Sequence, residues 1–311
     1  ASGDSNGLSA ERSNESIKLT KGNPVDAGTY VSEVSPKFEA TTLGFPKMLT
    51  YLAYAALGKI ASEGEASPYT HTITPGESLP YITVFEQKGS ASAALAQLVD
   101  AKVDSFKMTA EGVAPISFDM TLNGCALEWL AATTWNGPAF ALSDGWFTLA
   151  DAEVLFSLST GTPVAVPVGV NLSKLEFEIS NGVSTQPVLG SPVPGDQVEA
   201  GATVTVNIEG TTDSTEMYRE VMTGSKTGTK LASTVVTGSL QMTFKHSTNS
   251  NFSLVLKVPM IPWNCDAMAV STDGGPFDLK LSTEGALDPG DGNGTVQIII
   301  TNDLAPIIDS E

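Results

Sequence analysis

The clearest pattern in the chain is an alternation of apolar and polar residues that occurs in two similar units. In the first unit, residues 103–124, the apolar positions are Phe106, Met108 and Ala110, followed by Ile116, Phe118, Met120 and Leu122. Because successive side chains of a strand point to opposite faces, each run has one apolar and one polar face. Gly112 and Pro115 supply a turn between the runs, so the unit is predicted to be a β-hairpin.

The second unit, residues 172–210, repeats this design. Leu175, Phe177 and Ile179 alternate with Glu176 and Glu178, and Asn181-Gly182 then turns the chain. A second alternating run follows, with Val204, Val206 and Ile208 as its apolar positions. Two hairpins of one design suggest a duplicated β unit.

One helix is expected, over residues 46–60. Pro46 suits a first helical position, and Gly58 is a plausible stop. Between them the apolar residues recur at helical spacing: Leu49, Leu52, Ala53, Ala56 and Leu57. This stripe predicts a helix that covers one face of a sheet.

Many further short strands are expected, at 70–74, 80–87, 151–158, 240–245, 252–258, 277–282 and 296–302. Residues 91–101 fit either a helix or a strand that leads into the first hairpin, 125–135 fit a short helix, and a short helical or irregular piece starts at Tyr218. Short strands with one helix predict a mainly β fold, a sandwich or barrel-like subunit with a duplicated hairpin and one flanking α-helix.

The ends of the chain differ from this pattern. Residues 1–23 are polar and are expected to be flexible, and residues 24–36 are expected to be extended at most. We predict an N-terminal arm over 1–40 that contacts another copy through Val25, Tyr30 and Val31. A β domain over 41–305 follows, in two related halves (41–160 and 161–305), and then a C-terminal tail over 306–311. Residues 182–202, rich in Gly and Pro, form a long excursion within the second half.

Charge narrows the range of functions. The 311 residues include 35 acidic and 16 basic ones, for a net charge of -19. This argues against nonspecific binding to nucleic-acid phosphates, which requires a basic surface. The acidity is equally consistent with solubility alone. The N-terminus shows no signal peptide, and no apolar run is long enough to cross a membrane.

Catalytic and metal-binding motifs are absent or weak. The two histidines, His71 and His246, suggest no catalytic triad, and neither a nucleophile elbow nor a dinucleotide fingerprint occurs. Residues 288–294 combine Asp, Asn and Gly as calcium loops do, but position 12 is Ile299 rather than Glu, so a hairpin turn is favoured. Glu176 and Glu178 are taken as a solvated strand face rather than as glycosidase carboxylates. We therefore predict no catalytic, cofactor-binding or metal-binding residue.

Two other residue types, cysteine and tryptophan, each allow two interpretations. Cys125 and Cys265 form no metal-binding pair, and two buried free thiols are favoured over one long-range disulfide. Trp129, Trp135 and Trp146 are expected to pack in a core; an exposed platform would instead suggest a carbohydrate-binding module.

The order of several short motifs resembles a known family. An apolar helix ending in Leu57-Gly58 is followed by Thr-His-Thr-Ile-Thr-Pro at 70–75 and a strand opening at Leu79-Pro80. The 103–124 hairpin then follows, and the second half ends a strand at Val258-Pro259. Over residues 40–305 this order resembles the major tail tube proteins of long-tailed bacteriophages with non-contractile tails.

The resemblance implies a non-enzymatic β-sandwich subunit that forms hexameric rings stacked into a tube. It also implies contacts with the tape-measure protein, with tail-terminator and tail-tip proteins, and with double-stranded DNA that passes without specific binding. Such a protein would assemble in the host cytoplasm, would reside in the virion, and would not insert into a membrane. The long arm and the 182–202 excursion depart from a minimal tube subunit.

An acidic channel wall would repel DNA phosphates. We hypothesise that Asp119, Glu176 and Glu178, on the polar faces of the two hairpins, contribute to such a wall. A virion decoration or capsid-associated β protein is the main alternative, and a carbohydrate-binding β-sandwich is another.

Overall fold

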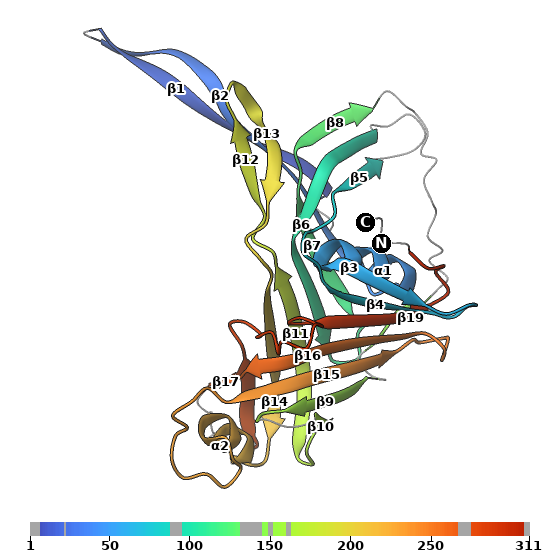
Figure 1. The fold of residues 1–311 in the computed structure, drawn as a ribbon. Helices are drawn as coiled ribbons and strands as arrows, with labels where there is room; N and C mark the ends of the chain where they lie inside the picture. The colour runs from blue at the N-terminus through green and yellow to red at the C-terminus, as the bar shows by residue number, and fades with distance from the viewer. Residues whose placement is uncertain are drawn as a thin grey trace.

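The computed structural model describes residues 7–21, 23–87, 95–130, 145–148, 152–159, 163–266 and 275–307, with the backbone alone for the strand residues among 16–28. Antiparallel strands dominate these residues, and two helices accompany them. The strands form two large sheets around one hydrophobic core, and a small two-stranded sheet stands apart (Figure 1). The predicted mainly β, sandwich-like fold is confirmed.

The larger sheet has ten strands, and eight of them follow the order β1-β2-β7-β6-β11-β14-β18-β17. Their bounds are β1 (Gly7–Lys21), β2 (Asn23–Leu43), β7 (Ser117–Asn123), β6 (Leu95–Glu111), β11 (Val170–Ser180), β14 (Thr203–Thr212), β18 (Phe277–Ser282) and β17 (Asn264–Cys265). The other two, β5 (Ile82–Gln87) and β8 (Ala126–Leu130), pair with the first part of β6. The uncertain segment 91–101 is therefore a strand where it is described, and 126–130 is a strand rather than the expected helix.

The smaller sheet has seven strands in the order β10-β9-β15-β16-β19-β4-β3. Their bounds are β10 (Val164–Ala165), β9 (Glu153–Ser157), β15 (Thr237–Lys245), β16 (Ser253–Pro262), β19 (Gln297–Asn302), β4 (Tyr69–Pro75) and β3 (Gly58–Glu63). Strands from both halves of the sequence are neighbours here, because β9 pairs with β15 and β4 pairs with β19. The two halves therefore share both sheets and one core.

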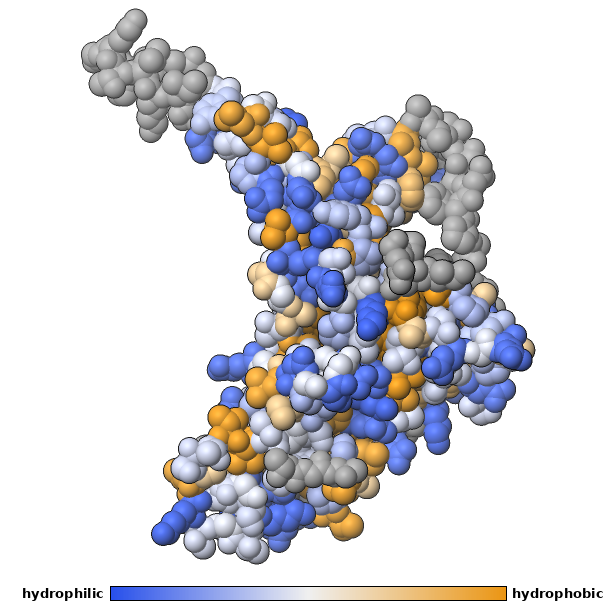
Figure 2. Space-filling model, in the orientation of Figure 1, coloured by the Kyte–Doolittle hydropathy of each residue, from blue (hydrophilic) through white to orange (hydrophobic). Residues whose placement is uncertain are grey.

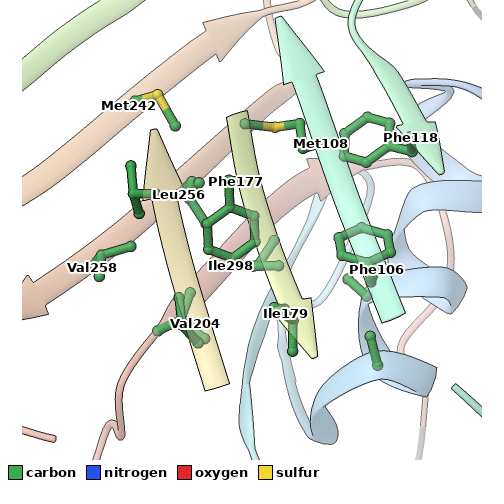
Figure 3. Close-up of a cluster of buried hydrophobic side chains, with 14 of the residues drawn as sticks. Phe106, Met108, Phe118, Phe177, Ile179, Val204, Met242, Leu256, Val258 and Ile298 are labelled. Carbon is green, nitrogen blue, oxygen red and sulfur yellow. The ribbon is translucent and has the colours of Figure 1, made fainter. Parts of the chain in front are cut away.

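The predicted hairpins are adjacent in the larger sheet. β6 pairs with β7, β11 pairs with β14, and β6 also pairs with β11, so four strands carry the two alternating patterns side by side. The apolar positions named above for both patterns are buried, as predicted. Figure 3 shows Phe106, Met108, Phe177 and Val204 of this sheet facing Met242, Leu256, Val258 and Ile298 of the smaller sheet. Each such side chain stabilises the fold by about 1.5–3 kcal/mol when it leaves water.

Helix α1 (Pro46–Leu57) packs against strands of both sheets (Figure 1). Gly58 ends it in a left-handed conformation, with φ of 90°, as the stop signal predicts. Two buried amides hold its ends: Asn181 Nδ2 donates to the carbonyls of Ala56 (3.0 Å) and Val103 (2.9 Å). Asn302 Nδ2 donates to the carbonyl of Pro46 at 3.1 Å. The helix therefore joins the sheets rather than covering one of them.

Residues 7–21 form a regular strand rather than the flexible segment that was expected, and residues 24–36, which were expected to be extended, belong to β2. Residues 7–43 form a long antiparallel hairpin, with Gly7 opposite Glu39 and Lys21 opposite Asn23. Of β2, only residues 37–43 also pair with β7, so the rest of the hairpin projects away from the sandwich (Figure 1). Its polar residues lack an apolar face, which is why no periodicity indicated a strand.

The Gly- and Pro-rich excursion also contains a hairpin, formed by β12 (Ser184–Val188) and β13 (Ser191–Val198). It continues from β11 and returns into β14, and β13 packs beside β2. Figure 1 shows both hairpins extending from the same end of the sandwich. At the opposite end lies the short helix α2 (Glu216–Thr223), at the position where a helical or irregular piece was expected.

One predicted hairpin turn is wrong. Residues 288–294 lie between β18, which belongs to the larger sheet, and β19, which belongs to the smaller one, so they connect two sheets. The carboxylates of Asp288 and Asp291 instead accept hydrogen bonds from the backbone N–H groups of Gly290 and Asn293. These local Asx turns explain the composition that resembled a calcium loop.

The role of Asn181 gives a test of the fold. We expect Asn181→Ala to lower the free energy of unfolding by about 2–4 kcal/mol, because the buried carbonyls of Ala56 and Val103 lose their donor. Asn171→Ala, at an exposed position of β11, the strand that ends just before Asn181, is the matched control and should change stability by less than about 0.5 kcal/mol. Urea unfolding followed by circular dichroism measures both, and equal midpoints for the two variants would contradict this role.

Candidate assembly interface

The outer face of the larger sheet brings the three predicted carboxylates together. The polar residues of both hairpin patterns point away from the core, and the strand register places Asp119, Lys107 and Glu178 in one row across β7, β6 and β11. Glu176 lies in the next row, opposite Thr109 of β6. We call this surface the polar face. Its existence follows from the alternating sequence, and the pairing of β6 with β11 joins its two parts.

The polar face carries lysines as well as carboxylates. Glu176 Oε1 lies 3.1 Å from Nζ of both Lys107 and Lys174. Partial burial alone would raise the pKa of Glu176, but the hydrogen bonds and positive charges of Lys174 and Lys107 outweigh it and lower that pKa. Asp119 accepts a 2.6 Å hydrogen bond from Thr41 Oγ1 of β2. The lysines of the polar face therefore balance part of the negative charge that a count of its carboxylates suggests.

The sequence-based hypothesis considered the carboxylates and missed the lysines between them. The signal was present, because Lys107 alternates with Phe106 and Met108 and must share the polar face. A neighbouring row across β6, β11, β14 and β18 alternates in charge: Glu111, Lys174, Glu209 and Lys280. Opposite charges on paired strands stabilise a sheet.

The predicted arm residues lie on β2, within the projecting hairpin. Tyr30 is 49% exposed, and its hydroxyl donates a 2.6 Å hydrogen bond to Glu15 of β1, which raises the pKa of Tyr30. Val31 is half-buried. Val25 pairs through its backbone with Leu19, and its side chain lies outside the described part of the chain. Tyr30 and Val25, which were predicted to contact another copy, therefore also make contacts across the hairpin itself.

The base of the β12–β13 hairpin is fixed to the sandwich by buried polar contacts. Lys102 is only 6% exposed, and its ammonium lies 3.0 Å from Glu199 Oε2. Burial alone would lower the pKa of Lys102, but the hydrogen bond and charge of Glu199 raise it overall. The same ammonium lies 4.4 Å from the ring centre of Tyr81, whose hydroxyl donates to Asp196 at 2.6 Å. These contacts fix the direction in which the hairpin projects.

A pocket lies at the other end of the β11–β14 strand pair. It has a volume of about 260 Å³ and an apolar lining that includes Phe156, Leu158, Val164, Val168, Val170 and Met217. Ser159 Oγ donates to Glu220 at its edge, at 2.8 Å. Two of the lining residues, Val164 and Val168, are exposed to solvent. The pocket is therefore open to solvent, and Glu216, Glu220 and Lys226 contribute charged groups to its otherwise apolar and hydroxyl-bearing lining.

The histidines occupy structural positions. His71 is completely buried; its Nε2 donates to the carbonyl of Leu304 at 3.1 Å, and its Nδ1 accepts from Ser62 Oγ at 2.8 Å. Burial lowers the pKa of His71, so it stays neutral and holds β3 and β4 to the C-terminal segment. His246 is buried between the rings of Phe147 and Phe252. Among the described residues, no group of three or more His, Cys, Asp or Glu side chains is placed to hold a metal ion.

Two of the three tryptophans that were expected to pack in a core do not do so. Trp129 is 66% exposed and Trp146 is 38% exposed, whereas Trp135 lies outside the described residues. Trp129 belongs to β8, which pairs with β6 beyond the region where the two sheets face each other. Cys125 and Cys265 are both free and half-buried, and burial raises the pKa of the Cys265 thiol to about 11.

Comparison with protein-family models and with curated proteins finds no match to this chain. Within the part of the chain that is described, no helix has the length and apolar character needed to span a membrane. The geometry itself therefore carries the functional argument: a polar sheet face, two projecting hairpins at one end and an apolar pocket at the other.

The lysine pair on the polar face gives a prediction about charge. We expect the double variant Lys107→Met, Lys174→Met to raise the pKa of Glu176, because partial burial then acts without opposing positive charge. A carboxyl-carbon NMR titration measures the shift. An unchanged pKa would show that the two ion pairs do not persist in solution.

The same pair makes stability depend on pH. Because the pKa of Glu176 is lower in the folded state, its stabilising contribution is present above the unfolded pKa of about 4.3 and is lost as the pH falls through the folded pKa. We therefore expect Glu176→Gln to be less stable than the unsubstituted protein near neutral pH and equally stable in acid below the folded pKa of Glu176. Unfolding midpoints at the two pH values measure this, and a pH-independent difference would contradict it.

Proposed function

We propose that this protein is a structural subunit that assembles with copies of itself into stacked rings, forming a tube like the tail tube of a long-tailed bacteriophage. In this proposal the rings are hexameric, and the channel holds a tape-measure protein during assembly and later passes double-stranded DNA. Terminator and tip proteins close the two ends of the tube. The resemblance in motif order supports this proposal, and the sandwich fold is compatible with it.

One observation carries the proposal: two hairpins leave the same end of the sandwich without a core of their own. A two-stranded hairpin is at best marginally stable in water by itself. In the described residues 9–15 of β1, every side chain is exposed. Backbone pairing of 15 residues in β1 with β2 therefore gains little from burial within one copy. A neighbouring copy provides the missing contact surface.

The sheet edges give a second reason for self-association. β3 and β10 end the smaller sheet, and β1 ends the larger one. Edge strands expose unpaired backbone N–H and C=O groups, which pair readily with strands of other copies. A closed ring of subunits satisfies these groups without leaving an open edge.

In this proposal the polar face of the larger sheet lines the channel. With a net charge of -19, the assembled surface repels phosphates, and the lysine–carboxylate pairs of the polar face keep its local field moderate. DNA then passes without a continuous basic groove to bind it. Asp119 and Glu178 are the carboxylates expected to contribute most, since Glu176 is held between two lysines.

The assembly itself is the first test. We expect the purified chain to form rings or tubes with a central hole as its concentration rises, visible by negative-stain microscopy and measurable by light scattering. Shells or isolated knobs on shells would favour a decoration or capsid-associated protein. A strictly monomeric species at high concentration would contradict the proposal.

The orientation of the polar face is a second test. In a background with Cys125→Ser and Cys265→Ser, a thiol is placed on the polar face by Thr205→Cys, or on the outer face of the smaller sheet by Thr243→Cys. Both positions are half-buried strand residues. In tubes, a small maleimide should label both, whereas a maleimide attached to a large protein should label only the second. Equal labelling by the large reagent would remove the polar face from the channel.

A further inference from the structure

We infer that copies stack head to tail by inserting the apolar tip of the β12–β13 hairpin into the pocket beside α2 of the next copy. This inference rests on the proposed function and adds a specific contact to it. The tip consists of Val188, Leu189 and Gly190, and the receiving surface is the pocket lined by Phe156, Val164, Val168 and Met217.

The tip exposes apolar side chains to an unusual degree. Val188 pairs with Ser191, which leaves Leu189 and Gly190 as a two-residue turn. Gly190 has a φ of 85°, a conformation that glycine adopts without strain, and this turn places Leu189 at the apex. Leu189 is 103% exposed and Val188 is 47% exposed. Their positions at the end of a projecting hairpin leave them in water unless another molecule covers them.

The tip also lacks charge. Residues 184–194 contain no Asp, Glu, Lys or Arg, in a protein that carries 51 such residues. The pocket is similarly apolar in its interior, with Phe156, Leu158 and Met217 among its buried lining residues. Figure 2 shows hydrophobic residues at the surface around the hairpins and around α2. An apolar projection and the apolar part of a pocket gain free energy when they exclude water together.

The two surfaces lie at opposite ends of one continuous strand pair. β11 begins at Val170 and β14 ends at Thr212, and both residues line the pocket. At their other ends these strands continue into β12 and β13, which carry the tip (Figure 1). A projection at one end and a complementary pocket at the other make a head-to-tail contact, which does not close within a pair and continues as a stack.

The pocket carries charged side chains of both signs. Residues 221–265 contain four lysines and no acidic residue, although the whole chain is strongly acidic. One of them, Lys226, lines the pocket. Beside the β12–β13 hairpin, Glu33 of β2 contributes to the cleft between the two hairpins. Glu216 and Glu220 line the same pocket as Lys226, so its rim is not basic, and the contact is expected to depend on the burial of apolar surface.

The strand pair also limits the spacing of the stack. Eighteen residues separate Val170 from Val188, so at about 3.3 Å per residue the axial repeat is at most about 60 Å. A longer repeat in a tube would place the tip out of reach of the pocket and would overturn the inference.

The test compares substitutions at the tip and at the pocket rim. We expect Leu189→Asp to abolish stacking and leave single rings, whereas Leu189→Met, which keeps an apolar side chain, should form tubes as the unsubstituted protein does. Val168→Asp, at an exposed rim position, should act like Leu189→Asp. Negative-stain microscopy and sedimentation measure both. Tubes formed by Leu189→Asp would overturn the inference, and loss of rings as well as tubes would show that the tip acts within a ring instead.

Cross-linking gives an independent result. In the Cys125→Ser, Cys265→Ser background, the pair Leu189→Cys with Val168→Cys should yield a ladder of covalent oligomers on a denaturing gel after oxidation of the tubes. Val113→Cys in place of Val168→Cys is the matched control, because Val113 is an exposed apolar residue that does not line the pocket. Tubes that form without a ladder would contradict the contact between the tip and the pocket, but not the proposed function. Failure of the unsubstituted protein to form any assembly would instead contradict the proposed function.

Discussion

The strands of the two projecting hairpins pair with each other but have no hydrophobic core beneath them. The proposed assembly depends on this constraint. Backbone hydrogen bonds organise the β1–β2 and β12–β13 hairpins, but net stability in water comes mainly from burial of apolar surface. The sandwich obtains that burial from one core between two sheets, to which both hairpin patterns of the sequence contribute. The projecting hairpins obtain little of it within one copy. In the proposed assembly, further copies supply the burial that these hairpins lack.

The same sandwich determines how charge is distributed. Because the core occupies one face of each sheet, the carboxylates of β6, β7, β11 and β14 must share the opposite face with the lysines of those strands. Lys107 and Lys174 hold Glu176 at 3.1 Å each, so the polar face combines paired ions with unbalanced carboxylates. Among the described residues of this face the lysines lie between carboxylates, which is compatible with the proposed channel for DNA.

The sequence predicts the sandwich well because one buried face imposes a period of two on each strand. Phe106, Phe177 and Ile208 alternate with polar residues and are all buried. The β1–β2 hairpin could not be predicted in this way, since its sequence has no apolar period and every side chain of residues 9–15 is exposed. The partners of β4 and β19 depend on the order of strands from distant parts of the chain, which local patterns do not encode. Trp129 was assigned to a core from its residue type, although its strand lies outside the region between the sheets.

Amide hydrogen exchange of the two hairpins, compared between dilute and assembled protein, tests the central claim most directly. If copies supply the missing contacts, the backbone amides of β1, β2, β12 and β13 exchange rapidly in dilute protein and become protected on assembly. The amides of β6 and β11 stay protected in both states, because the core covers these strands. Equal protection of the hairpins at all concentrations would show that they are stable within one copy, and would contradict the account.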